Sequence, residues 1–272
     1  MPTYESADGL TLHYLDEGEG RPVLCLPGLT RNASDFDYLA PYLPDVRLIR
    51  PDYRGRGKSD WADPETYTVP VEARDIVSLL DHLGLDSAAV IGTSRGGIIA
   101  MMLAATSKAR LQGVCLNDIG PVIDQAGLDR ISSYVGQRPR AATRSELAAA
   151  LPGAFPDFEG VPDSRWAEEA ARHTVETDTG LNINYDPRLK DAFDVANAAG
   201  PVDLWPLFDA MDGLPLAVIR GANSDLLSPA TVEEMCRRRP DLIQAEVPGR
   251  GHIPFLDEPE AIETIRSWLA GL

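Results

Sequence analysis

Short apolar runs recur along the chain, and most of them end in a turn rich in glycine, proline or aspartate. Continuous apolar runs are typical of strands that are buried on both faces of a sheet. They alternate with segments whose apolar residues recur at helical spacing, such as residues 71–83. We predict strands at residues 23–26, 46–50, 88–91, 112–116, 214–220 and 243–247, preceded by a hairpin at residues 3–15. This alternation predicts an α/β fold with a mostly parallel, doubly wound sheet of about eight strands.

The strand pattern is interrupted between residues 122 and 201. This segment shows no clear strands, and its helical stretches, such as residues 144–151 and 164–173, are separated by breaks rich in proline and glycine. We therefore expect residues 1–121 and 202–272 to form one core domain. Residues 122–201 are expected to form a helical cap that is inserted into this core.

Length and charge narrow the class of protein. A chain of 272 residues can bury one large core with an insertion. Its formal net charge of -17 disfavours nucleic acid and anionic lipid as partners. The N-terminus lacks a signal-peptide pattern, no run approaches the roughly 20 apolar residues of a membrane span, and three cysteines give no disulfide framework. We expect a cytoplasmic monomer or homodimer that acts on a small-molecule substrate.

One glycine-flanked serine joins a predicted strand to a predicted helix, in the sequence Gly92-Thr93-Ser94-Arg95-Gly96. Glycines are needed there because a Cβ would press on the strand or on the incoming helix. The turn exposes the Ser94 hydroxyl at the carboxyl end of a strand, where open α/β sheets bind ligands. It also places Ser94 at a helix N-terminus, which favours negative charge. The alternative interpretation is an ordinary glycine-rich turn with an incidental serine.

A serine nucleophile needs a histidine as base and a carboxylate that orients the histidine. Of the four histidines, His252 alone lies in a glycine-flanked loop just after a predicted strand. Carboxylates that follow predicted strands include Asp52, Asp118 and Asp225. The carboxyl ends of parallel strands meet at one edge of a sheet, so Ser94, His252 and a carboxylate can come together there.

Taken in order, these segments resemble the α/β-hydrolase fold family over essentially the whole chain. The matching segments are residues 26–29, 52–59, 92–97, 221–225 and 251–252. The resemblance implies Ser94 as the nucleophile, His252 as the general base and Asp225 as the residue that orients it. The chain order Ser94, Asp225, His252 is the one expected of this fold. The resemblance also implies a cap in the insertion, and an oxyanion hole made by the backbone N–H groups of Leu29 and Arg95.

Two positions depart from the usual family pattern. Pro27 stands where relatives usually have a histidine, and Arg95 stands where a hydrophobic residue, glutamine or methionine is more usual. The oxyanion hole uses backbone atoms, so we expect it to survive both changes. The Arg95 side chain could hold a substrate carboxylate, or form a salt bridge with the cap or the rim of the core.

The resemblance implies a serine esterase or lactonase that cleaves a small-to-medium carboxylic ester or lactone through an acyl-enzyme, with no metal or organic cofactor. Carbon–carbon bond hydrolysis of a diketone acid is the alternative reaction. A small-molecule receptor that retains the triad is an alternative of another class. A serine nucleophile in place of aspartate argues against the epoxide and haloalkane branches of the family. Candidate substrate contacts are Arg31, Tyr134 and Trp205.

Overall fold

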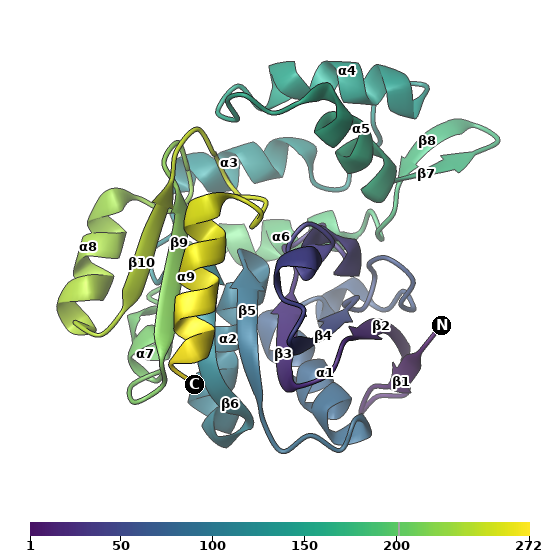
Figure 1. Cartoon of the computed structure of the whole chain (residues 1–272). Coiled ribbons are helices and arrows are strands. Elements are labelled where there is room, and N and C mark those ends of the chain that lie inside the picture. The colour runs from purple at the N-terminus through teal and green to yellow at the C-terminus, as the bar shows by residue number, and fades with distance from the viewer. Residues whose placement is uncertain (201) are drawn as a thin grey trace.

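The computed structural model describes residues 1–200 and 202–272. Its main strands are β1 (Thr3–Glu5), β2 (Thr11–Glu17), β3 (Arg21–Leu26), β4 (Val46–Pro51), β5 (Ala88–Thr93), β6 (Leu111–Asn117), β9 (Leu216–Gly221) and β10 (Ile243–Val247). They form one eight-stranded sheet in the order β1-β2-β4-β3-β5-β6-β9-β10 (Figure 1). The β1–β2 and β2–β4 pairs are antiparallel, and the other neighbouring pairs are parallel. The prediction of a mostly parallel α/β sheet of about eight strands is confirmed.

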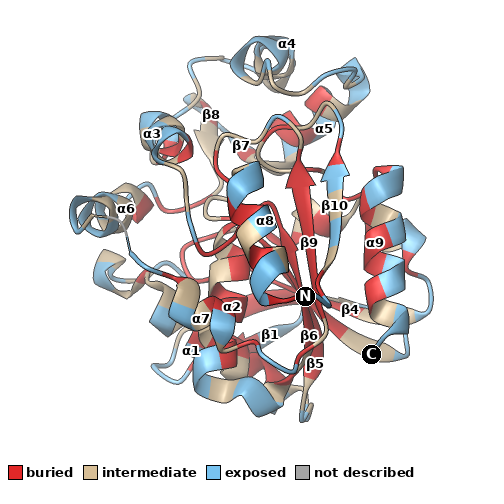
Figure 2. Cartoon of the chain, turned by 90° about the vertical axis from the view of Figure 1, so that its left-hand side faces the viewer, coloured by how far each residue is buried: buried red, intermediate tan, exposed pale blue. Residues whose placement is uncertain are grey.

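Helices cover both faces of this sheet. They are α1 (Val69–His82), α2 (Arg95–Ser107), α7 (Trp205–Asp209), α8 (Pro229–Arg238) and α9 (Pro259–Ala270). Val90 of β5 packs into the core that includes α1, α2, α7 and α8, whereas its neighbours Ala89 and Ile91 pack on the α9 side. Figure 2 shows the resulting layers, with buried strands between helices whose outer faces are exposed. Burial on both faces explains why the central strands are continuous apolar runs.

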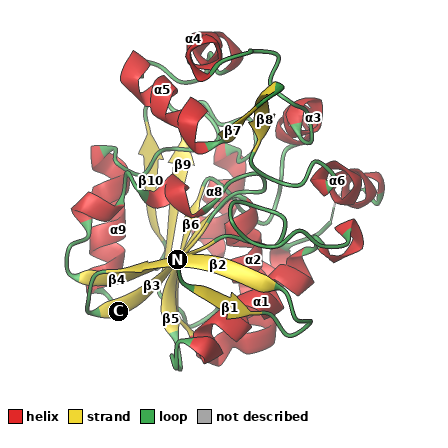
Figure 3. Ribbon diagram, turned by 90° about the vertical axis from the view of Figure 1, so that its right-hand side faces the viewer, coloured by secondary structure: helices red, strands yellow, loops and turns green. Residues whose placement is uncertain are grey.

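The predicted cap segment contains α3 (Gln125–Tyr134), α4 (Arg144–Ala154), α5 (Asp163–Arg172), β7 (Thr174–Thr177), β8 (Gly180–Ile183) and α6 (Leu189–Ala198). These elements lie at the end of the sheet towards which β9 and β10 point (Figure 1 and Figure 3). The antiparallel β7–β8 hairpin corrects our expectation of no clear strands. Three of the four β7 residues are exposed, so this strand lacks the apolar run that marks a buried one. The predicted end of the cap, Pro201, lies outside the described residues.

Within the described part of the chain, no helix has both the length and the apolar character that crossing a membrane requires.

Candidate active site

Ser94 occupies the sharp turn between β5 and α2. Its backbone has φ 49° and ψ −113°, a conformation that a non-glycine residue adopts only when its surroundings hold it there. The Ser94 N–H donates to the Asn117 carbonyl at 2.9 Å, and the Ser94 carbonyl accepts from the Gly97 N–H at 2.9 Å. A Cβ on Gly96 would lie 2.1 Å from the Leu26 carbonyl oxygen. This clash explains the glycine at that position, and the turn presents the serine hydroxyl beyond the strand.

The Ser94 hydroxyl heads a chain of side-chain hydrogen bonds. Its Oγ lies 3.0 Å from Nε2 of His252, and Nδ1 of His252 lies 2.7 Å from Oδ2 of Asp118. His252 therefore bridges the serine and the carboxylate through its two ring nitrogens. Asp118 is fully buried and Ser94 is nearly so. This geometry suits an imidazole that accepts the serine proton while a carboxylate fixes its tautomer and orientation.

Asp118 is held in place by β9 and the loop that follows it. Its own N–H donates to the Ile219 carbonyl at 2.7 Å. Oδ1 accepts from the Gly221 N–H at 2.8 Å, and Oδ2 accepts from the Ser224 hydroxyl at 2.6 Å. Because β6 and β9 are neighbours in the sheet, the residue that directly follows β6 meets both β9 and the His252 loop.

These contacts correct the expectation that Asp225 orients His252. Oδ2 of Asp225 instead lies 3.2 Å from Nη1 of Arg130 on α3, and the same guanidinium also binds Asp157 at 2.8 Å. Asp225 stands well past the end of β9, and Ser224 fills the place beside the Asp118 carboxylate. The signal that could have favoured Asp118 is its distance from the preceding predicted strand, which is two residues after position 116, whereas Asp225 lies five residues after position 220.

The loop after β3 runs beside Ser94. A Cβ built on Gly28 would lie 3.9 Å from the Ser94 Cβ and 3.2 Å from the Arg31 Cγ. Leu29 follows Gly28 in this loop, and Arg95 is the first residue of α2. The backbone segments of Leu29 and Arg95 thus flank the serine, and the assignment of their N–H groups to an oxyanion hole stays a prediction.

The Arg95 side chain points towards α1. Its Nε donates to Glu72 on α1 at 2.7 Å, and its Nη2 donates to the Tyr67 carbonyl at 2.9 Å. Burial opposes ionisation of Glu72, but the charges of Arg56 and Arg95 outweigh this effect and hold the pKa of the carboxyl below its ordinary value. Of the two alternatives for Arg95, the structure contains the salt bridge.

Arg31 lies in a small recess beside the turn. The recess has a volume of about 20 Å³, and its lining includes Arg31, Thr93, Asn117, Glu169 and Pro254. Nη1 of Arg31 donates to Oε2 of Glu169 on α5 at 2.8 Å, and the Arg31 side chain remains 26% exposed. Arg31 belongs to the loop after β3, and its hydrogen bond to Glu169 connects this loop to the predicted cap.

The two aromatic candidates lie in different places. Tyr134 ends α3 in the predicted cap and is 42% exposed, and its contact with substrate stays a prediction. Trp205 begins α7, at the opposite end of the sheet from the predicted cap (Figure 1). Its ring packs against Phe208, with 5.6 Å between centroids, and under the Arg238 guanidinium at 3.9 Å. This placement corrects the assignment of Trp205 to the site, since the side chain is partly buried and packs against the core at the other end of the sheet.

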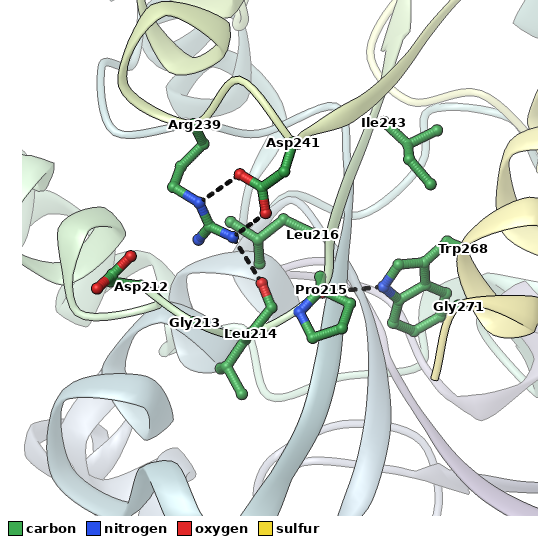
Figure 4. Close-up of a pocket in the computed structure, with 10 residues that line it drawn as sticks. All are labelled: Asp212, Gly213, Leu214, Pro215, Leu216, Arg239, Asp241, Ile243, Trp268 and Gly271. Atoms are coloured by element: carbon green, nitrogen blue, oxygen red, sulfur yellow. Dashed lines mark hydrogen bonds and ion pairs between the residues drawn. The ribbon is translucent and has the colours of Figure 1, made fainter.

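A larger cleft lies away from Ser94. It has a volume of about 340 Å³ and lies where β9 and β10 begin, between Arg239, Asp241 and Trp268 (Figure 4). Arg239 is bound to Asp241 at 2.6 Å and to the Leu214 carbonyl at 2.7 Å, while the Trp268 indole donates to the Pro215 carbonyl at 3.0 Å. Arg239, Asp241 and the Trp268 indole thus all have polar partners within the lining. Among residues 1–200 and 202–272, no group of three or more His, Cys, Asp or Glu side chains is arranged to hold a metal ion.

The chain is similar to several known proteins. The model of the alpha/beta hydrolase family matches residues 23–265. A 3-hydroxybutyrate-oligomer hydrolase from Cupriavidus necator is 37% identical over 266 residues, which cover 94% of this chain and 90% of that protein. A 2-(acetamidomethylene)succinate hydrolase from Mesorhizobium japonicum is 30% identical, over 92% of this chain and 88% of that protein.

The fold is also similar to that of solved hydrolases. The crystal structure of an alpha/beta hydrolase from Novosphingobium aromaticivorans has a TM-score of 0.91 and 40% identity, and the match covers 100% of this chain and 98% of that one. These relatives imply hydrolase activity for this chain, and they confirm the family resemblance of its motifs. The chain therefore belongs to the alpha/beta hydrolase family.

Proposed function

We propose that this protein is a serine hydrolase that cleaves a carboxylic ester through an acyl-enzyme intermediate. The observation that carries the proposal is the hydrogen-bonded chain from Ser94 Oγ to His252 at 3.0 Å and from His252 to Asp118 at 2.7 Å. In this proposal Ser94 is the nucleophile and His252 is the general base. Asp118, in place of Asp225, orients the imidazole.

The reaction has two halves. In the first, His252 Nε2 takes the proton of Ser94 as Oγ attacks the ester carbonyl, and then gives this proton to the departing alcohol. The backbone N–H groups of Leu29 and Arg95 bind the oxyanion, and one such donor is worth about 2.7–4 kcal/mol of barrier. In the second half, His252 activates a water molecule that hydrolyses the acyl-enzyme. No step needs a metal ion or an organic cofactor.

The substrate we propose is an ester of a hydroxy acid that carries a free carboxylate. The name of the 37% identical relative specifies 3-hydroxybutyrate oligomers, whose units are joined by esters and which end in a carboxylate. The name of the 30% identical relative specifies a substituted succinate, which also carries carboxylates. Both names support an anionic group on the substrate of this chain.

Arg31 is our proposed contact for that carboxylate. It lies next to Gly28, which itself approaches Ser94. Within the described residues, the hydrogen bonds and ion pairs of its guanidinium all use Nη1, with Glu169, His173 and Asp35 as partners. Nε and Nη2 therefore remain free to bind a carboxylate in the forked geometry that arginine favours. Tyr134 stays a second candidate contact, from the side of the predicted cap.

The test is a substrate panel on the wild type and on Ser94→Ala. It contains the 3-hydroxybutyrate dimer, the methyl ester of that dimer, a lactone and a diketone acid. We expect serine-dependent hydrolysis of the dimer, with a loss in kcat on the order of 10⁶-fold in Ser94→Ala. If Arg31 binds the carboxylate, the free dimer should exceed its methyl ester in kcat/KM by about 10-fold or more, and Arg31→Gln should remove this preference.

The matched control is Ser267→Ala, because Ser267 is an exposed serine on α9. It should leave turnover unchanged. Hydrolysis that persists in Ser94→Ala would contradict the mechanism. Turnover of the diketone acid alone would replace ester hydrolysis by carbon–carbon cleavage. Tight binding of panel compounds without turnover would favour a receptor.

A further inference from the structure

A buried cluster of three charged side chains connects the two segments that flank Ser94. Glu72 on α1 is fully buried, and so is Arg56, which lies in the loop after β4. Oε1 of Glu72 lies 2.8 Å from Nη1 of Arg56, and Oε2 lies 2.7 Å from Nε of Arg95. The carboxylate therefore holds one guanidinium on each of its oxygens.

Each guanidinium also donates a hydrogen bond to a backbone carbonyl group. Nε of Arg56 donates to the carbonyl oxygen of Leu29 at 2.9 Å. Nη2 of Arg95 donates to the Tyr67 carbonyl at 2.9 Å, which ties the start of α2 to the segment before α1. The connection thus runs from Leu29 through Arg56 and Glu72 to Arg95. These end points are the two residues whose N–H groups we assign to the oxyanion hole.

Stability alone does not account for such a cluster. Removing three charges from water costs as much as their mutual attraction returns, and well-packed apolar residues often replace buried ion pairs without loss. Within the described residues, Glu72 and Arg56 bind each other, Arg95 and backbone carbonyl groups and make no hydrogen bond to Ser94 or His252, so the cluster has no direct part in proton transfer. What the cluster does provide is a side-chain connection between the Leu29 loop and the start of α2, in addition to the pairing of β3 with β5 that brings the two segments together.

We propose that Glu72 and Arg56 are positioning residues that set the separation of the Leu29 and Arg95 N–H groups in the oxyanion hole. This inference rests on the proposed function. An oxyanion hole works when its donors lie about 2.7–3.1 Å from the position of the developing charge. A misplacement of about 1 Å can cost on the order of 10²-fold in rate, so small shifts of either loop matter.

The decisive variant is Glu72→Gln, which keeps the size of the side chain and removes its charge. We expect kcat for the ester substrate to fall about 10- to 100-fold while KM changes by less than about 3-fold, since the defect lies in the transition state. The affinity of a boronic acid that mimics the tetrahedral adduct should fall in parallel with kcat. A second variant, Arg95→Met, leaves the backbone N–H and the Arg56–Glu72 pair in place, and should show a smaller loss of the same kind.

The matched control is Asp75→Asn on the same helix. Asp75 forms a buried pair with Arg54 at 2.7 Å, but this pair touches neither Leu29 nor Arg95. Both Glu72→Gln and Asp75→Asn should lower the unfolding temperature, and only Glu72→Gln should lower kcat. Thermal unfolding of each variant shows whether it folds, and Arg95→Met decides the question if Glu72→Gln does not.

Three results would overturn the inference: a kcat in Glu72→Gln within about 2-fold of wild type, an equal loss of kcat in Asp75→Asn, or a change in KM alone. These outcomes are distinct from failure of the proposed function. If Ser94→Ala retains turnover, the serine mechanism fails whatever Glu72 does. If Ser94→Ala is inactive and Glu72→Gln is fully active, the mechanism stands and the positioning role does not.

Discussion

The carboxylate of Asp118 accepts three hydrogen bonds, from two separate segments of the chain. The donors are the Gly221 N–H, the Ser224 hydroxyl and Nδ1 of His252. The residue itself has φ 54°, so its backbone turns sharply at the end of β6. Three donors and a constrained backbone leave the carboxylate one orientation, which in turn fixes the imidazole that faces Ser94.

Asp118→Asn should therefore be far more damaging than a change at Asp225. An amide in place of the carboxylate favours the wrong tautomer of His252, and the equivalent change in a protease triad lowers kcat by about 10⁴-fold. We expect a loss of that order, measured as kcat on the ester that the wild type hydrolyses best. Asp225→Asn is the matched control, and it should stay within a few-fold of wild type. If Asp225→Asn proved the more damaging variant, the assignment to Asp118 would be wrong.

At the level of single residues, the choice between Asp118 and Asp225 is the one that the sequence could not decide. The sequence marks Ser94 through its flanking glycines and His252 through its loop, and the structure brings these two side chains together. Asp118 and Asp225 both follow predicted strands and both lie between Ser94 and His252 in the chain, so order cannot separate them. What separates them is the path of residues 221–225, which turns Ser224 towards Asp118 and Asp225 towards Arg130. That path depends on tertiary contacts.

At the scale of elements, α5 connects the predicted cap to residues of the predicted core domain. The Tyr38 ring lies between two arginines of this helix, with Arg165 at 3.6 Å and Arg172 at 4.2 Å from its centroid. The same arginines form ion pairs with core residues, Arg165 with Asp257 at 2.5 Å and Arg172 with Asp37 at 2.7 Å. Cation–π contacts are worth about 0.5–2 kcal/mol each, depending on solvent exposure. Two of them on one ring make Tyr38 one attachment point of α5, beside these ion pairs.

Tyr38→Ala should loosen α5 without unfolding the core. We expect faster proteolytic cleavage within residues 125–198 and a KM for the ester raised about 3- to 10-fold, because both cation–π contacts are lost. Limited proteolysis and steady-state kinetics on the same preparation measure the two effects. The control is Tyr42→Ala, at an exposed tyrosine of the same connection between β3 and β4. Equal cleavage rates in the two variants would contradict this account of α5.

The elements also show which local signals are reliable. The central strands were predictable because burial on both faces demands continuous apolar runs, as in β5, where every residue is buried. The β7–β8 hairpin was not predictable on that basis, since most of β7 is exposed and its sequence is Thr-Val-Glu-Thr. A strand that is stabilised by one partner and by the helices around it leaves little trace in its own hydropathy.

For the whole molecule, the sheet is the structure on which the site depends. β5 ends at the Ser94 turn and lies between β3 and β6. Those two neighbours each carry a cysteine, Cys25 in β3 and Cys115 in β6, and both are fully buried on the α9 side of the sheet. Cys236 on α8 is only partly buried. The three thiols thus differ in how far they are buried, two beneath the surface in the sheet and one partly exposed on a helix.

Reaction with a thiol reagent should distinguish the buried thiols from the partly exposed one. Burial raises the pKa of the Cys25 thiol to about 12, and it raises the pKa of Cys115 as well. At pH 8 a thiol with that pKa is ionised to only about 10⁻⁴, and it is also shielded from reagent. We therefore expect Cys236 alone to react in the native protein, and all three cysteines to react in urea with the cooperative unfolding of the sheet. Mass spectrometry of the labelled peptides assigns the sites, and Cys236→Ser should remove the native reaction. Rapid labelling of Cys25 or Cys115 under native conditions would mean that β3 or β6 opens locally, and a sheet that opens beside β5 could not hold Ser94 in the strained turn described above.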